Sequence, residues 1–162
     1  MEEWDLLASI EKAGENYIVR FERALNYTVE EVWPWLTENE KLAQWFSELR
    51  VGELGNSGFM QFDMQDGTCE KLEITDFTNG SVLEFAWWDD SVRFELHEAS
   101  IGCDLVLIET MNKITDHTPK DLAGWHVCLD VIGALLDGQH IERMTEWKKW
   151  YEKYVQAIEK IT

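Results

Sequence analysis

The segment from Arg50 to Met111 constrains the fold most, because it consists of short apolar stretches separated by turn sequences. The turns are GELGNSG, QDGT, TNG, WDDS and SIG, and Gly, Asn and Asp are typical of tight turns. Each connection is too short for a crossover helix, so successive strands are expected to pair antiparallel. The expected strands are Phe59 to Met64, Cys69 to Phe77, Val82 to Trp88, Val92 to His97 and Cys103 to Asn112.

One further strand and two short helices are expected before this meander. Residues 17–25, YIVRFERAL, alternate apolar and polar side chains, as a strand with one buried face does. Thr28 precedes VEEVWPWL, and Glu31 is placed to complete a capping box at the start of a helix. Pro34 lies inside this helical pattern and can distort it. A second short helix is expected from Glu38 to Phe46.

Two amphipathic helices are expected after the meander. Thr118 and Pro119 suit the N-cap and first position of a helix over KDLAGWHVCLDVIGALLDG, which Gly138 ends. A second helix is expected from Ile141 to Ile161, where apolar residues recur every three or four positions. Its aromatic residues are expected to dock it on the domain or to make a dimer contact. They are Trp147, Trp150, Tyr151 and Tyr154.

This order of elements predicts an α+β fold, a curved antiparallel sheet of about six strands wrapped around the helix from Lys120 to Asp137. A coiled sheet can cover its concave face only with a long element laid across it. Contact between a curved sheet and a straight helix is incomplete at one end, so a cavity is expected there. A chain of 162 residues forms one core, so residues 1–162 are expected to be a single domain, with core 17–138 and C-terminal helix 141–161.

Charge and cysteine content limit the partners. The formal net charge is −18, with 32 acidic and 14 basic residues, and it repels nucleic-acid phosphates and anionic membranes, so neither partner is expected. Cys69, Cys103 and Cys128 lie too far apart for a CxxC pair, and the histidines lack metal-ligand spacing. No metal or cofactor is expected. The start, MEEWDLLAS, lacks signal-peptide features, and no stretch is apolar enough to span a membrane, so a cytoplasmic location is expected.

Four motifs together resemble a known family. VEEVWPWLTENEKLAQWF, GNSGFMQFDM, LEFAWW and GWHVCLDVIGALLDG resemble, in this order, the bacterial family similar to the activator of heat-shock protein 90 ATPase, within the SRPBCC or START-like superfamily. The resemblance covers about residues 17–138. It implies the helix-grip fold and a cavity between the sheet and the last long helix. Superfamily relatives bind lipids, sterols, polyketides or plant phenolics, and a few are cyclases or hydroxylases. The domain that makes much of the chaperone contact in eukaryotic activators has no counterpart here, so ATPase activation is not expected.

Large side chains from separate elements are candidates for the wall of this cavity. Aromatic residues at core spacing either fill such a space or line a pocket within it, and the sequence supports both interpretations equally. The candidates are Trp33, Trp45, Met60, Phe62, Phe85, Trp87, Phe94, Trp125 and Leu129.

Two polar residues, His126 and Glu109, are also candidates for contact with a ligand. His126 precedes Asp130 by four positions, so the two can pair on one helix. It could orient a polar ligand group or act as a general base, but a structural histidine is the favoured interpretation. Glu109 continues the inward-facing parity of its strand, and burial without a partner would raise its pKa. Alternatively, Glu109 meets water or a basic side chain such as Arg93.

These observations leave three functional hypotheses. The first is binding of a small apolar or aromatic molecule in the cavity. The alternative is a protein-interaction module, chaperone-associated or homodimeric, that acts through the C-terminal helix and the acidic surface. The third is an enzyme of cyclase or hydrolase type that uses His126 or Glu109. It has the least support, and no catalytic residue is assigned.

Overall fold

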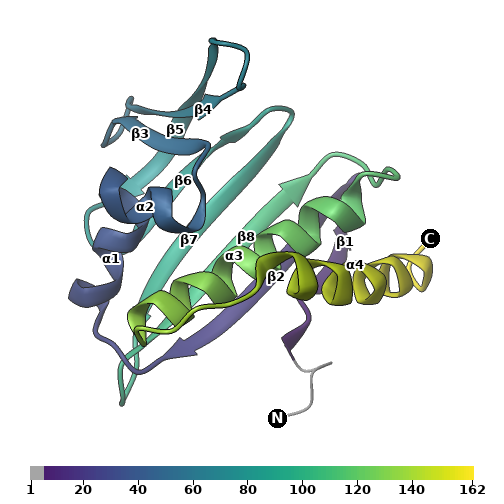
Figure 1. Cartoon of the computed structure of the whole chain (residues 1–162). Coiled ribbons are helices and arrows are strands. Elements are labelled where there is room, and N and C mark those ends of the chain that lie inside the picture. Colours follow the sequence, from purple (N-terminus) through teal and green to yellow (C-terminus); the bar gives the residue numbers. More distant parts are fainter. Residues whose placement is uncertain (1–5) are drawn as a thin grey trace.

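One eight-stranded antiparallel sheet forms the frame of the protein, with strand order β1-β2-β8-β7-β6-β5-β4-β3 (Figure 1). The computed structural model describes residues 6–162. The first five residues of MEEWDLLAS lie outside the described residues. In chain order the elements are β1 (Ser9–Ala13), β2 (Asn16–Leu25), α1 (Val29–Thr37), α2 (Asn39–Trp45), β3 (Leu49–Glu53), β4 (Phe59–Asp63), β5 (Cys69–Thr78), β6 (Val82–Trp87), β7 (Asp90–Glu98), β8 (Cys103–Met111), α3 (Thr118–Leu136) and α4 (Arg143–Glu159).

The expected α+β architecture is confirmed, but the sheet has eight strands rather than about six. The additional strands are β1, with sequence SIEKA, and β3, with sequence LRVGE. Both lie at the edges of the sheet, where each pairs with one neighbour, β2 and β4 respectively. Edge strands are short and polar on at least one face, so their hydrophobic alternation is weak. Pairing with an existing strand is therefore what makes these segments extended.

The capping box at the start of α1 is confirmed. The Glu31 N–H donates to Thr28 Oγ1 at 3.1 Å, and the Thr28 N–H donates to Glu31 Oε1 at 3.0 Å. Pro34 lies inside α1, which continues through it to Thr37. A single residue, Glu38, lies between the end of α1 and the start of α2, so the two helices form a bent pair between β2 and β3.

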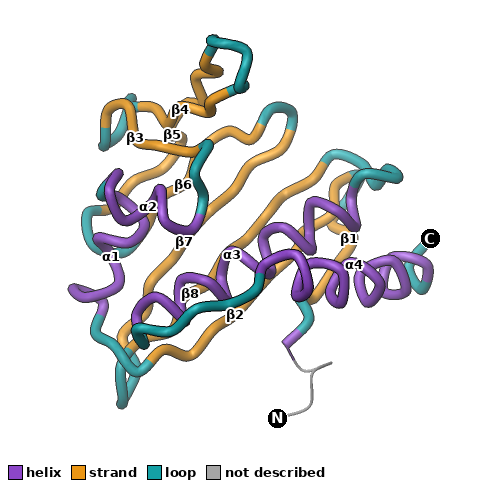
Figure 2. Tube along the Cα trace, viewed as in Figure 1, coloured by secondary structure: helices purple, strands orange, loops and turns teal. Residues whose placement is uncertain are grey.

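The long helix α3 lies across the sheet, and α4 packs along it (Figures 1 and 2). The N-cap of α3 is His117 rather than Thr118, so the helix begins one residue earlier than expected. Gly138 follows its end with φ of +70°, a left-handed conformation that glycine adopts without steric cost. No helix in residues 6–162 is both long enough and apolar enough to cross a membrane.

Most of the space between the sheet and α3 is filled by side chains. Met60 of β4, Phe85 of β6, Phe94 of β7 and Leu129 of α3 are all buried, and they belong to one hydrophobic core. Phe85 and Phe94 stack with their ring centroids 6.4 Å apart. This packing leaves room toward the start of α3, where α2 and the β6–β7 hairpin approach the helix.

Candidate ligand-binding site

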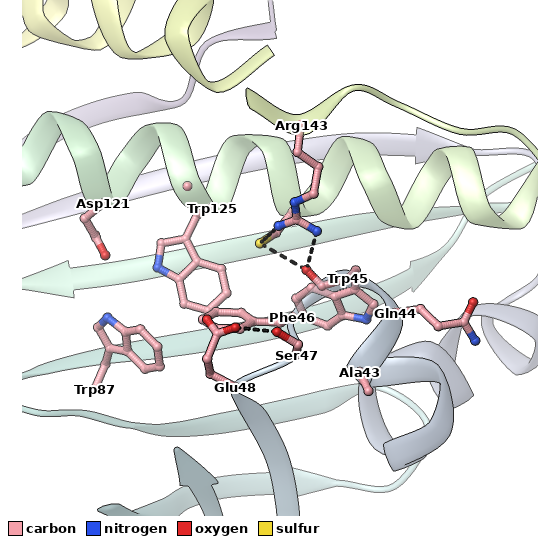
Figure 3. A pocket seen from close by; sticks show the side chains of 12 residues that line it. Ala43, Gln44, Trp45, Phe46, Ser47, Glu48, Trp87, Asp121, Trp125 and Arg143 are labelled. Atoms are coloured by element: carbon pink, nitrogen blue, oxygen red, sulfur yellow. Dashed lines mark hydrogen bonds between the residues drawn. The ribbon is translucent and has the colours of Figure 1, made fainter. Parts of the chain in front are cut away.

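A pocket of about 500 Å³ opens between α2, the end of β6 and the first half of α3 (Figure 3). We call it the α2 pocket. Three aromatic rings form its apolar wall, because Phe46, Trp87 and Trp125 contact one another with centroids 5.1–6.0 Å apart. Its lining residues are Ala43, Gln44, Trp45, Phe46, Ser47, Glu48, Trp87, Asp121, Gly124, Trp125, Cys128 and Arg143.

The end of α2 places Phe46 in this wall. Phe46 is the C-cap of the helix and has a non-helical backbone, while its N–H still bonds to Leu42 O at 2.9 Å. The preceding Trp45 is buried, and its indole N–H donates to Trp35 O at 2.7 Å. Adjacent aromatic residues therefore take different roles, with Trp45 anchoring the helix and Phe46 half-exposed over the pocket.

Arg143, the first residue of α4, lies at one end of the α2 pocket, opposite Asp121 and Trp87 (Figure 3). Its guanidinium donates to Trp45 O at 2.8 Å and approaches Cys128 Sγ at 3.5 Å. Burial raises the pKa of the Cys128 thiol to about 11, although the Arg143 charge opposes this rise. Cys128 is therefore a neutral wall residue rather than a nucleophile.

A second pocket, of about 440 Å³, lies between the β6–β7 hairpin and the start of α3. We call it the hairpin pocket. It shares Trp87 and Asp121 with the α2 pocket, so these two residues form a shared wall. Its lining residues are Phe62, Trp87, Trp88, Asp89, Asp90, Met111, Asn112, Lys113, Thr115, His117, Thr118 and Asp121.

Trp88 stands at the hairpin pocket in an uncommon conformation. Its φ is +55°, a region that bulky residues rarely occupy, and 47% of its surface is exposed. Its ring contacts Trp87 at 5.0 Å and Phe62 at 5.1 Å between centroids. The hairpin therefore holds an accessible indole over a pocket with two further aromatic rings.

Behind the shared wall lies Glu109 of β8, which is only 1% exposed. Burial raises the pKa of Glu109 well above its ordinary value, and the charges of Asp121 and Asp90 raise it further. Burial also raises the pKa of Asp121, while its interaction with Glu109 and the charge of His117 oppose that rise. Two buried acids that face each other cannot both ionise readily, so the pair keeps a proton to a higher pH than an isolated carboxyl does.

His126 lies away from both pockets, in the contact between α3 and α4. It is completely buried, and its ring stacks on Trp150 with centroids 3.8 Å apart. The Tyr154 hydroxyl accepts a hydrogen bond from the Ala8 N–H at 3.0 Å and is hydrogen-bonded to His126 Nδ1 at 2.7 Å. Nε2 lies 3.4 Å from Asp130 Oδ2. Burial lowers the pKa of His126 to about 2, so the ring is neutral and joins α3, α4 and the chain before β1.

Residues 26–137 match the family described as Activator of Hsp90 ATPase homolog 1-like protein, and this match covers more than half of the chain. The chain belongs to this family. The family is of the SRPBCC type, and the sheet wrapped on α3 fits the helix-grip fold. No curated protein matches the sequence.

Several solved structures share this fold. A conserved protein of unknown function, EF2215 from Enterococcus faecalis, is 26% identical with a TM-score of 0.86, and the match covers 96% of this chain and 92% of that one. CalU16 from Micromonospora echinospora is 19% identical with a TM-score of 0.67, and coverage is 92% and 94%. BPP1335 from Bordetella parapertussis is 22% identical with a TM-score of 0.65, and coverage is 93% and 91%.

In this family member, the eleven candidate residues from the sequence fall into separate groups. Trp45, Trp87 and Trp125 line the α2 pocket, and Phe62 and Trp87 line the hairpin pocket. The others line neither pocket: Met60, Phe85, Phe94, Leu129, Glu109 and His126 are buried, and Trp33 packs on Phe77 with centroids 6.0 Å apart.

Sequence reasoning missed several pocket residues. Asp121 and Arg143 are polar positions of the two expected amphipathic helices and were not among the candidates, and Trp88 was placed at the end of an expected strand. Phe46 ends the expected second short helix, directly after the candidate Trp45, and this position was the one available signal for it. Residues 6–162 contain no group of three or more His, Cys, Asp and Glu side chains arranged to hold a metal ion.

Proposed function

We propose that this protein binds a small, largely apolar or aromatic molecule in the α2 pocket and the adjoining hairpin pocket. The observation that carries the proposal is the α2 pocket, about 500 Å³ in volume and walled by Phe46, Trp87 and Trp125. Small-molecule sites typically enclose about 300–1,000 Å³ and combine apolar walls with a few polar groups. The helix-grip fold of the family is compatible with such a role.

Two polar residues make the two ends of the α2 pocket chemically different. Asp121 lies at one end, next to Trp87, and the Arg143 guanidinium lies at the other (Figure 3). The guanidinium already donates to Trp45 O at 2.8 Å, so its position is set before a ligand arrives. An elongated ligand with an aromatic body would stack on the three rings and place polar groups at the ends.

The alternative hypothesis, a docking module that acts through α4, has less support from the geometry. Trp150 and Tyr154 of α4 are buried within the domain, where Trp150 stacks on His126 at 3.8 Å. They are therefore occupied in holding α4 in place. An enzyme that uses His126 also has less support, because the ring is neutral and lies outside both pockets.

The proposal is tested with a size series at Gly124, which lines the α2 pocket on α3. A Cβ at this position would meet no atom within 4 Å, so a longer side chain enters open space. We expect N-phenyl-1-naphthylamine, an uncharged fluorescent aromatic, to bind the natural protein and Gly124→Ala with saturable fluorescence. Gly124→Leu is expected to abolish the saturable signal.

Gly133→Ala is the matched control, because Gly133 lies on the same helix outside both pockets. It should bind the probe as the natural protein does. Equal binding by Gly124→Leu would show that the probe lies elsewhere. A flat response of the natural protein across a chemically broad panel of apolar ligands would count against the function itself.

A further inference from the structure

The shared wall of the two pockets has a buried acid behind it. Trp87 and Asp121 face both pockets, and Glu109 lies behind Asp121 in the seam between β8 and α3. The carboxyl of Glu109 faces Asp121 and Asp90, both of which line the hairpin pocket. Three acids from β7, β8 and α3 therefore converge where the two pockets meet.

The Glu109 carboxyl has no basic partner in the protein itself. Neither of its oxygens accepts a hydrogen bond from an N–H group of the described residues, and the polar group that interacts with this buried side chain is the Asp121 carboxyl. Within residues 6–162, no Lys, Arg or His side chain forms an ion pair with Glu109 or Asp121. The Trp87 side chain does form a hydrogen bond to Asp121, but buried acids are normally also paired with a positive charge, and this cluster is short of positive charge.

The basic groups nearest to the cluster are at the rim. Lys113 and His117 line the hairpin pocket, and both are exposed. The His117 charge acts on Asp121 only through space, without an ion pair. Asp90, for its part, already accepts a hydrogen bond from the Asn112 N–H at 3.0 Å. Glu109 and Asp121 are therefore the two acids of this cluster that lack a positively charged partner.

The walls around these acids suit an organic cation. Trp87 and Trp88 contact each other at 5.0 Å, and Phe62 contacts both, at 5.6 and 5.1 Å. Aromatic faces attract cations, and Trp does so most strongly. Trp88 is exposed and held at φ of +55°, which is locally unfavourable for a bulky residue. Such strain persists where the surroundings enforce it, and it clusters at ligand-binding sites.

We propose that the bound molecule carries a protonated nitrogen, held at the shared wall by the carboxyl of Asp121, which Glu109 contacts from behind, and by the faces of Trp87 and Trp88. This inference rests on the proposed function and names the chemical class of its ligand. The cation supplies the positive charge that the acid cluster lacks within the protein. The formal charge of −18 also favours the approach of a cation over that of an anion.

The test uses three matched probes, 2-(1-naphthyl)ethylamine, 2-(1-naphthyl)ethanol and 1-naphthylacetate, measured by titration calorimetry near neutral pH. The amine is expected to bind about tenfold more tightly than the alcohol, the size of a charge-assisted hydrogen bond. The carboxylate is expected to bind weakest.

Glu109→Gln and Asp121→Asn are expected to lower the affinity for the amine about tenfold, to the level of the alcohol, and to leave the alcohol unchanged. Glu70→Gln is the matched control, because Glu70 is an exposed acid of β5 that lines neither pocket. It should alter neither affinity. Two substitutions at separate elements keep the test valid if one of them impairs folding.

The possible results separate the two proposals. Equal affinities for amine and alcohol overturn the inference but leave the proposed function standing. A preference for the amine that survives both substitutions shows that the cation binds elsewhere, which also overturns the inference. Failure of all three probes to bind overturns both the inference and the proposed function.

Discussion

Glu109 of β8 and Asp121 of α3 face each other across the seam between the sheet and the long helix, and burial raises the pKa of both. Asp90 of β7 faces the same pair, and His117 faces Asp121 from the turn before α3. The pair therefore links the stability of the protein to pH. An acid whose pKa is higher in the folded state than in the unfolded state stabilises the fold at pH values below its unfolded-state pKa. This contribution is lost as the pH rises toward the folded-state pKa.

We predict that the natural protein loses stability relative to Glu109→Gln as pH rises above about 4.3, the ordinary value for Glu. Gln resembles the protonated acid but does not titrate, so the difference grows until the raised pKa of the folded state is passed. The slope is at most about 1.4 kcal/mol per pH unit for one group. Urea unfolding from pH 4.5 to 8.5 measures it. Glu70→Gln, at an exposed position of β5, is the control, and a pH-independent difference for Glu109→Gln would contradict the prediction.

We predict that Tyr154→Phe destabilises the protein by about 1–3 kcal/mol. The substitution removes the hydroxyl that accepts from the Ala8 N–H at 3.0 Å and lies 2.7 Å from His126 Nδ1, and it leaves these buried groups unpaired. Tyr151→Phe is the matched control on α4, since Tyr151 is partly exposed and stacks on Trp147. Denaturant unfolding compares them, and equal free energies of unfolding would argue against this contact between α3 and α4.

We predict that Gly124→Ala raises the free energy of unfolding by about 0.5–1 kcal/mol, because Ala costs less backbone entropy than Gly in a helix. The added methyl group meets no atom within 4 Å. Gly133→Ala should give a similar gain, because its Cβ would meet only Leu25 Cδ2 at 3.8 Å. Thermal or urea unfolding measures both. A loss of stability confined to Gly124→Ala would show that the α2 pocket is not open beside α3.

We predict that a disulfide reagent labels one of the three thiols quickly in the native protein and all three in denaturant. Cys69 is exposed, whereas Cys103 and Cys128 are buried. Burial raises the pKa of both buried thiols, so they have little reactive thiolate near neutral pH. Cys69→Ser should remove the fast reaction. Rapid labelling of this variant would show that one of the two buried thiols is accessible.

Several features of the fold follow from local sequence alone. The six expected strands, the capping box of Thr28 and Glu31, and the stop at Gly138 depend on neighbouring residues. The alternation of apolar and polar residues, helical periodicity and turn-forming residues act over a few positions, so they can be recognised in a single sequence. The edge strands β1 and β3 are different, because their extended form comes from pairing with β2 and β4.

The site was decided by tertiary structure. The sequence alone indicated that large aromatic residues would meet between sheet and helix, but not which of them would leave a gap. Packing decides that, since Met60, Phe85, Phe94 and Leu129 fill the centre of the core and room remains beside Phe46, Trp87 and Trp125.

The rotation of α3 about its own axis determined where its polar side chains lie. It turns His126 toward Trp150 and Tyr154 of α4 and brings Asp121 to Glu109 of β8. Helical periodicity places residues on a common face but does not tell which neighbouring element covers that face. The local sequence therefore determined the elements and their family, whereas the contacts between distant elements determined where a buried acid meets an open pocket.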